Sequence, residues 1–427
     1  MLRISWRLGG EHQARNPQVR ISPMTTNQTV TNGPLSDLRL IEMGTLLAGP
    51  FCGQLMGDFG AEVIKVEAPG KGDPMREWGQ EKSHGMSLWW PVIARNKKSV
   101  TLNLREQEGQ DIARELISKA DFLLENFRPG TMQRWNLSYE ELKKINPGLI
   151  MIRVSGYGQT GPYSKRAGFG AVGEAMGGLR YVCGDPSTPP SRMGISIGDS
   201  LAATFACIGA LSALHHRERT GEGQVVDSAI YEAVLNMMES LITEYDKGDY
   251  IRERQGSILP NVAPSNVYPT KDEKMILIAA NQDTVFARLA EAMGRPELAE
   301  EERYKTHSAR GANQVELDDL VAEWTRTINA QELEDLMEEY GIPSGKIYRA
   351  PDMLEDAHFK ARKAIIKTQH PKFGELLMQN VAPKLSATPG SVRTPGPELG
   401  QHNNEIYREL LNYDSQRMEE LMSSGII

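Results

Sequence analysis

The sequence predicts an α/β protein, built on an open sheet of parallel strands that helices cover. Three observations lead to this prediction. Residues 38–67 have the pattern of a strand, a helix and a second strand in close succession, and such units build parallel sheets. The alternation continues to residue 154. A second, shorter α/β pattern begins near residue 275, beyond a polar stretch punctuated by Gly and Pro.

The first unit begins with a short apolar strand, Leu38–Met43. A helix follows over Ala48–Phe59, where Pro50 suits the first turn and Gly60 ends the helix. The second strand of the unit is Glu62–Glu67.

The alternation then repeats. An amphipathic helix around Leu116 precedes a strand over Phe122–Asn126. The next helix opens at Ser138, which forms a capping-box pattern with the Glu three residues later, and it ends near Asn146. A strand over Leu149–Val154 follows.

Apolar residues at helical spacing predict a helix that begins at Asp199. A short strand at Val225–Val226 precedes a long helix over Ser228–Tyr245, and Lys247–Pro264 has the composition of a linker. The rest of the chain is expected to hold a strand over Met275–Ala279 and four helices, over Thr284–Met293, Val315–Thr327, Ala330–Tyr340 and Asn404–Leu411. A closing turn is expected at Gly341–Gly345 and a Pro-rich segment at Pro383–Pro397.

Composition excludes several classes of protein. The net charge of −8 argues against a general nucleic-acid binder. We expect no membrane span, because no apolar run approaches the length needed. The three cysteines lie far apart, which offers no disulfide framework and favours a reducing compartment. The histidines lack metal-ligand spacing, so we expect no structural metal.

Residues 1–35 are rich in Arg and poor in acids, and we expect a flexible N-terminal extension there. Two interpretations stay open. The segment is either a tail foreign to the fold, including one that follows a start codon placed too early, or a mitochondrial transit peptide. The first predicts a cytoplasmic protein and the second a mitochondrial one.

The strongest single candidate for chemistry is Asp199, in Gly198-Asp-Ser200 at a break between an extended segment and a helix. Backbone N–H groups gather at a helix N-terminus, where they would hold a carboxylate ionised and oriented as a nucleophile. The plainer interpretation is that Asp199 is only an N-cap. A dinucleotide enzyme is disfavoured, because Ala48-Gly-Pro50 lacks the Gly-rich fingerprint that cradles a pyrophosphate.

Short blocks of sequence decide between these interpretations. In order along the chain they are Leu47–Phe51, Gly57–Glu67, Gly70–Asp73, Arg95–Ser99, Glu125–Gly130, Asn146-Pro147, Ser155–Pro162, Gly198–Ser200, Thr220–Gln224 and Leu399–His402. Each is a weak signal alone, but the ordered set closely resembles the class III CoA-transferases, the family of formyl-CoA transferase and carnitine CoA-transferase. The resemblance covers nearly the whole chain from Leu35.

The resemblance implies that Asp199 is the nucleophile. Its carboxylate would attack an acyl-CoA thioester to give an aspartyl-acyl anhydride, and CoA would return to form an aspartyl-CoA thioester. The acceptor acid would then take the CoA. CoA is thus expected as a substrate, with no permanently bound cofactor. The residues expected to bind it are Leu102, Arg105, Asn126, Phe127, Arg134, Lys97 and Phe169, with Lys98 a further candidate for its phosphates.

Departures from the formyl branch point to the substrate. Gly170 stands where that branch has an acid, Phe169 where it has a Tyr, and Thr45 and Ala68 at basic or His positions. Longer matches resemble the branch that moves CoA from succinyl-CoA to dicarboxylates such as malate, citramalate, itaconate or glutarate. A second carboxylate needs a cation, for which Arg153, Arg166 and Arg192 are equal candidates.

Two other functions are weighed. The family also contains α-methylacyl-CoA racemases, whose His-Asp pair would fall on Phe169 and Gly170 here, and neither of these can move a proton. A non-catalytic acyl-CoA binding protein would be favoured had Asp199 been lost, and it is present.

The resemblance also implies the architecture, an interlocked homodimer in which each chain has a large Rossmann-like open-sheet domain and a smaller inserted α/β domain. We expect residues 1–35 as the extension, 36–230 as the first part of the large domain, and 231–263 as helix and linker. Residues 264–348 would form the small domain, and 349–427 a linker and a return to the large domain. A loop over Asp199 is expected from Gln255–Ser257.

Overall fold

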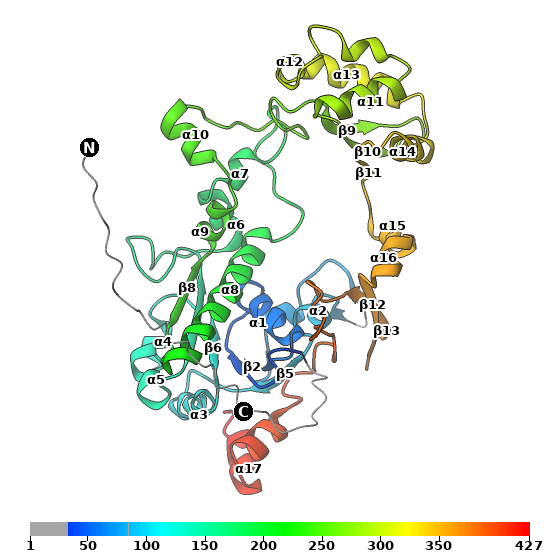
Figure 1. Ribbon diagram of the computed structural model, residues 1–427. Coiled ribbons are helices and arrows are strands. Elements are labelled where there is room, and N and C mark those ends of the chain that lie inside the picture. Colours follow the sequence, from blue (N-terminus) through cyan, green and yellow to red (C-terminus); the bar gives the residue numbers. More distant parts are fainter. Residues whose placement is uncertain (1–32, 84) are drawn as a thin grey trace, which may run out of the picture. The chain divides into compact units, whose positions relative to one another are not determined.

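A six-stranded sheet is the centre of the computed structural model, which describes residues 33–83 and 85–427 (Figure 1). Its strand order is β5-β2-β1-β6-β7-β8, and every neighbouring pair is parallel. The α/β prediction with a parallel sheet is therefore confirmed. The strands are β1 (Arg39–Glu42), β2 (Glu62–Glu67), β5 (Lys97–Thr101), β6 (Phe122–Glu125), β7 (Ile150–Ser155) and β8 (Val225–Ala229).

The sheet grows outward from β1 in both directions. The chain adds β2 and β5 on one side, then returns to add β6, β7 and β8 on the other. The order therefore reverses between β1 and β6. In open α/β sheets, ligands bind in the crevice beyond the carboxyl ends of the strands at such a point. The segments that follow β1 and β6 begin at Met43 and Asn126.

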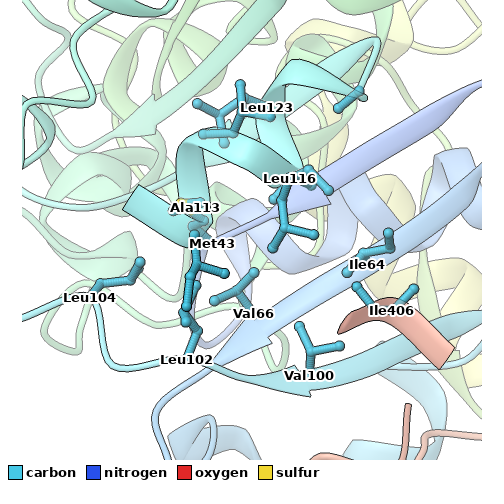
Figure 2. Close-up of a cluster of buried hydrophobic side chains, with 14 of the residues drawn as sticks. Met43, Ile64, Val66, Val100, Leu102, Leu104, Ala113, Leu116, Leu123 and Ile406 are labelled. Atoms are coloured by element: carbon cyan, nitrogen blue, oxygen red, sulfur yellow. The ribbon is translucent and has the colours of Figure 1, made fainter. Parts of the chain in front are cut away.

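The strands other than the edge strand β8 are buried on both faces, and successive side chains point to opposite sides. Leu40 faces one hydrophobic cluster together with α1 (Ala48–Asp58) and α8 (Ile197–Thr220). Its neighbour Ile41 faces the other cluster, part of which is drawn in Figure 2. That cluster is covered by α3 (Gln107–Ser118), α5 (Tyr139–Ile145), α17 (Ser415–Ser423) and the π-helix Asn404–Leu410.

Residues 265–346 contain a second, antiparallel sheet in the order β11-β10-β9, with its own hydrophobic cluster. Its strands and helices are β9 (Ser265–Pro269), β10 (Met275–Ala279), β11 (Ser344–Lys346), α11 (Asp283–Ala292), α12 (His307–Ala312), α13 (Gln314–Thr325) and α14 (Ala330–Glu339). The predicted elements of this region are thus found within two residues at each end. The division of the chain into domains stays a prediction.

One expectation about local structure is wrong, and two features were not predicted. The long helix over Ser228–Tyr245 is instead the end of β8 followed by two helices, α9 (Ile230–Asn236) and α10 (Leu241–Gly248). After α15 (Ala350–Glu355) and α16 (Ala357–Arg362), where no strand was predicted, the chain forms a hairpin of β12 (Ile365–His370) and β13 (Gly374–Gln379). Sequence patterns also missed strand β5. The expectation about residues 1–35 concerns a segment of which 1–32 lie outside the described residues.

Helix α8 corrects a further expectation, that no apolar run is long enough to span a membrane. By length and composition alone, its 24 residues meet that requirement. Its buried face is made mainly of alanines, and α8 packs along α1 and against the sheet. The same test is passed by a core helix of a folded domain, and the packing fits that role.

Candidate active site

Asp199 lies in the first turn of α8, three residues after Ser196, which occupies the N-cap position. The N-cap interpretation of Asp199 is therefore wrong. Among the residues that the structure describes, none donates a hydrogen bond to its carboxylate. The expectation that helix N–H groups hold this carboxylate is also wrong, because both of its oxygens stay available.

Two features raise the pKa of Asp199 to about 6. Burial is the larger, since it disfavours the charged form, and the neighbouring Glu174 carboxylate adds to it. The positive charge of Arg192 acts in the opposite direction. Asp199 is thus mostly ionised at neutral pH but more basic than an ordinary aspartate, which suits a nucleophile.

Glu174 is a site residue that the sequence analysis missed. It lies on α6 (Gly170–Met176) and is 2% exposed. Its carboxylate accepts the N–H of Gly198 at 3.3 Å and the Nε–H of Arg180 at 2.9 Å. The signal was its spacing: Glu174 lies one helical turn beyond Gly170, the position where an acid was sought.

Gly170 lies directly against Asp199, the expected nucleophile. A Cβ atom added at this position would be 2.3 Å from Oδ2 of Asp199, so any side chain there would require the Asp199 carboxylate to move. The missing acid at 170 is therefore a steric requirement for the observed position of Asp199. The second carboxylate reaches the site from Glu174 instead.

A pocket of about 440 Å³ surrounds Asp199 beyond the carboxyl ends of β1, β6 and β7. Three exposed aromatic rings line its wall, Trp78, Trp89 and Phe169, and the ring centroids of Trp78 and Phe169 are 6.3 Å apart. Two cations line it as well, Arg180 and Arg192. Of the residues expected to bind CoA, Asn126 and Phe169 belong to this pocket.

The loop that follows β1 forms the floor between this pocket and a second one. Asn126 fixes the loop by accepting the N–H of Thr45 and donating to its carbonyl, both at 2.8 Å. The carboxylate of Asp73 accepts the N–H of Leu46 at 3.0 Å. Leu46 has φ +64°, a left-handed conformation that a leucine adopts only where its surroundings enforce it.

The second pocket has a volume of about 680 Å³ and shares Thr45 with the first. Leu102, Arg105 and Phe127 line it, as expected for residues that bind one ligand together. Lys71 and Arg128 add two cations that the sequence analysis did not single out. The ring of Phe127 packs edge-on against Trp135 at 5.1 Å, so the pocket has an aromatic wall.

Three expected residues, Lys97, Lys98 and Arg134, line neither pocket. Lys97 is 2% exposed, and its ammonium binds Glu42 at 2.8 Å and the Pro50 carbonyl at 2.6 Å, so it does not fit the role of a phosphate ligand. Lys98 pairs with Glu62 and Glu405. Arg134 donates to the hydroxyl of Thr131, which lines the pocket, but does not line it itself.

The loop Gln255–Ser257 does not line the Asp199 pocket within this chain. The N–H of Gly256 donates to the carbonyl of Gly184 at 3.0 Å.

Comparisons with known proteins identify the family of the chain. The chain matches CoA-transferase family III over residues 35–403 and belongs to that family. It is 60% identical over 394 residues to the succinyl-CoA–D-citramalate CoA-transferase of Chloroflexus aurantiacus, covering 92% of this chain and 98% of that protein. It is 42% identical over 402 residues to the beta subunit of the succinyl-CoA–L-malate CoA-transferase of the same organism, covering 93% and 99%.

Among solved structures, a CAIB/BAIF family protein from Brucella suis superposes with a TM-score of 0.80 at 34% identity. The match covers 89% of this chain and 100% of that one. The chain is therefore an enzyme, a CoA-transferase.

The contact between Gly170 and Asp199 gives a first prediction. Gly170→Ala places a methyl group where the Asp199 carboxylate lies, so we expect kcat/KM to fall by about 10²-fold or more as the nucleophile is displaced. Gly248→Ala is the control, because a Cβ there meets nothing within 4 Å. Equal activity of the two variants in a CoA-transfer assay, at equal Tm, would contradict the geometry.

The pKa of Asp199 gives a second prediction. Because only the carboxylate form attacks, we expect kcat/KM for the acyl-CoA to fall as the pH drops through about 6. Glu174→Gln removes a negative neighbour, so the midpoint moves to lower pH. The measurement is the pH–rate profile of wild type, Glu174→Gln and the exposed-carboxylate control Glu218→Gln. If the midpoint of Glu174→Gln equals that of wild type, the electrostatic coupling between Glu174 and Asp199 is rejected.

The contrast between Lys97 and Arg105 gives a third prediction. Lys97→Gln breaks a buried ion pair and is expected to lower the free energy of unfolding by about 3 kcal/mol without raising KM. Arg105→Gln is expected to raise KM for acyl-CoA about tenfold with Tm unchanged, because it removes a positive charge from the pocket in which we expect the phosphates of CoA. Thermal melts and steady-state kinetics separate the two. The opposite pattern would restore Lys97 as a phosphate ligand.

Proposed function

We propose that this enzyme transfers CoA from succinyl-CoA to a 2-hydroxy dicarboxylate, citramalate or malate, through covalent intermediates on Asp199. The observation that carries the proposal is a half-buried carboxylate to which no described residue donates a hydrogen bond, in a pocket that shares the lining residue Thr45 with a larger pocket with cations and apolar walls. The substrates of the two Chloroflexus relatives support the choice of acids, since both act on succinyl-CoA and a hydroxy dicarboxylate.

CoA is proposed to bind with its nucleotide end in the larger pocket. Leu102 and Phe127 offer apolar surfaces for the adenine, and Lys71, Arg105 and Arg128 offer positive charge for the phosphates. The pantetheine arm would then pass the loop at Thr45 and bring the thioester into the smaller pocket. The support for this path is that Thr45 lines both pockets.

The proposed reaction begins when the Asp199 carboxylate attacks the thioester carbonyl of succinyl-CoA. The C–S bond breaks, CoA leaves as a thiolate, and a mixed anhydride forms. The thiolate attacks the aspartyl carbonyl, which releases succinate and leaves CoA on Asp199 as a thioester. The carboxylate of the acceptor attacks this thioester and displaces CoA again. CoA finally attacks the acceptor carbonyl, and Asp199 is regenerated as a carboxylate.

The alternative, an α-methylacyl-CoA racemase, lacks support at the residues that would carry it. Removal and return of a proton at one carbon needs titratable groups. Phe169 offers only a ring to the pocket, and Gly170 has no side chain at all. We therefore keep transfer of CoA as the proposed function.

A homodimer is also proposed as the working assembly. Its support is a set of exposed apolar side chains on α8, α9 and α10 and in the segments that join them. In a monomer these side chains would give the protein an unusually apolar surface in contact with water. They include Ile208, Leu211, Leu235, Met237, Ile242 and Tyr245.

The test uses the nucleophile. Wild-type enzyme is expected to move CoA from succinyl-CoA to D-citramalate or L-malate in a panel that includes itaconate, glutarate, oxalate and formate, read by mass spectrometry of the CoA esters. Asp199→Asn is expected to reduce transfer by at least 10⁴-fold while it still binds succinyl-CoA, because the amide cannot attack a thioester. Wild-type protein quenched during turnover is expected to carry CoA on the peptide that contains Asp199.

The control is Asp185→Asn, which changes an exposed carboxylate of the loop before α8. Full transfer activity in Asp199→Asn would disprove the assignment of the nucleophile. Epimerisation of a 2-methylacyl-CoA without any transfer by the wild type would favour the racemase instead.

A further inference from the structure

The two arginines that line the Asp199 pocket differ in whether a carboxylate of the protein already pairs with them. This difference indicates which of them binds the substrate acid. We propose that Arg192 binds the second carboxylate of the dicarboxylate, the one that does not react, and thereby makes the enzyme selective for dicarboxylates. This inference rests on the proposed function, since it assigns a specificity-determining residue to the same site.

Arg192 is poised to bind an anion. It lines the pocket that holds Asp199, and its charge is close enough to act on the Asp199 carboxylate. Its one hydrogen bond to a described residue runs from Nη2 to the hydroxyl of Ser196 at 3.2 Å. Over residues 33–83 and 85–427, no carboxylate forms an ion pair with it. Most of its five N–H donors are thus free for a carboxylate, which a guanidinium binds with two parallel hydrogen bonds.

The second arginine of the pocket is already neutralised. Arg180 donates to Glu174 at 2.9 Å, and Glu174 is buried. A substrate carboxylate bound to Arg180 would compete with this ion pair and would also meet the negative charge of Glu174. Arg180 is therefore better suited to hold Glu174 beside the nucleophile than to bind the acid.

The two other arginines that the sequence offered lie elsewhere. Arg153 is buried in β7 and pairs with Glu125 at 2.6 Å. The guanidinium of Arg166 stacks over the ring of Tyr163, 3.6 Å from its centroid. Neither residue lines the pocket. The structure therefore ranks the three candidates, which the sequence left equal.

The aromatic wall completes the match to a dicarboxylate. Trp78, Trp89 and Phe169 present apolar rings to the same pocket. A short dicarboxylate has charge at both ends and hydrocarbon between them, so its two ends suit Asp199 as the attacking group and Arg192 as the anchor. Because donor acid and acceptor acid react in turn at the same aspartate, one anchor selects both.

The test measures binding, so that it does not depend on turnover. In an Asp199→Asn background, the dissociation constants of succinyl-CoA and butyryl-CoA are compared by calorimetry, since the two differ only in the terminal carboxylate. We expect succinyl-CoA to bind more tightly by on the order of 10-fold to 10²-fold, the range for a charged hydrogen-bonded pair. Adding Arg192→Gln is expected to bring the ratio of the two constants close to one. Arg192→Lys is expected to keep part of it.

The matched control is Arg166→Gln, which removes an arginine outside the pocket and is expected to leave the ratio unchanged. A ratio that survives Arg192→Gln, or equal weakening of both thioesters, would overturn the inference. Failure of the proposed function would give a different result, namely no CoA transfer by wild-type enzyme to any acid of the panel.

Discussion

A single buried ammonium group holds together the loop on which both pockets depend. Lys65 lies on β2 with its side chain 1% exposed, and its Nζ binds Glu42 of β1 at 2.9 Å, Asp73 at 2.8 Å and the carbonyl of Gly44 at 2.8 Å. Burial alone would lower the pKa of Lys65, but the carboxylates around it raise that pKa above its ordinary value, so the group stays charged. Removing one partner of such a cluster leaves an uncompensated buried charge, which is costly.

The ion-pair cluster around Lys65 is linked to the active site through backbone atoms. Lys65 fixes Asp73, and Asp73 in turn accepts the N–H of Leu46 in its left-handed conformation. From the other side, Asn126 at the end of β6 clamps Thr45. The loop is thus held by groups from both sides of the point where the strand order reverses. In the proposed binding mode, this loop would keep the nucleotide end and the reacting end of the acyl-CoA in separate surroundings.

The sequence predicts what repeats along the chain and misses what depends on the folded neighbourhood. Strands such as Glu62–Glu67 and the start of α8 were predictable, because their apolar spacing and their breaks are local. Strand β5 was missed since two lysines, Lys97 and Lys98, open it, and only the buried Glu42 across the sheet explains a lysine inside it. Glu174 was missed for a similar reason, because its distance from Asp199 is set by the packing of α6 against α8. A family resemblance indicated Asp199 as the proposed nucleophile, but not Glu174, the neighbour that raises its pKa.

The environment of Asp199 also fits the energetics of exchange between two acids. CoA moves from one carboxylic acid to another of similar acidity, so the overall free-energy change is small and the enzyme needs no outside energy source. In the proposed mechanism, the Asp199 carboxylate must attack a thioester and later leave from an anhydride. Burial and Glu174 raise its pKa and so make it the stronger nucleophile, yet a pKa of about 6 still leaves it mostly ionised at neutral pH. A hydrogen-bonded cap would have stabilised the charge further and weakened the attack, which gives a physical reason for a carboxylate that no N–H group of the described chain contacts.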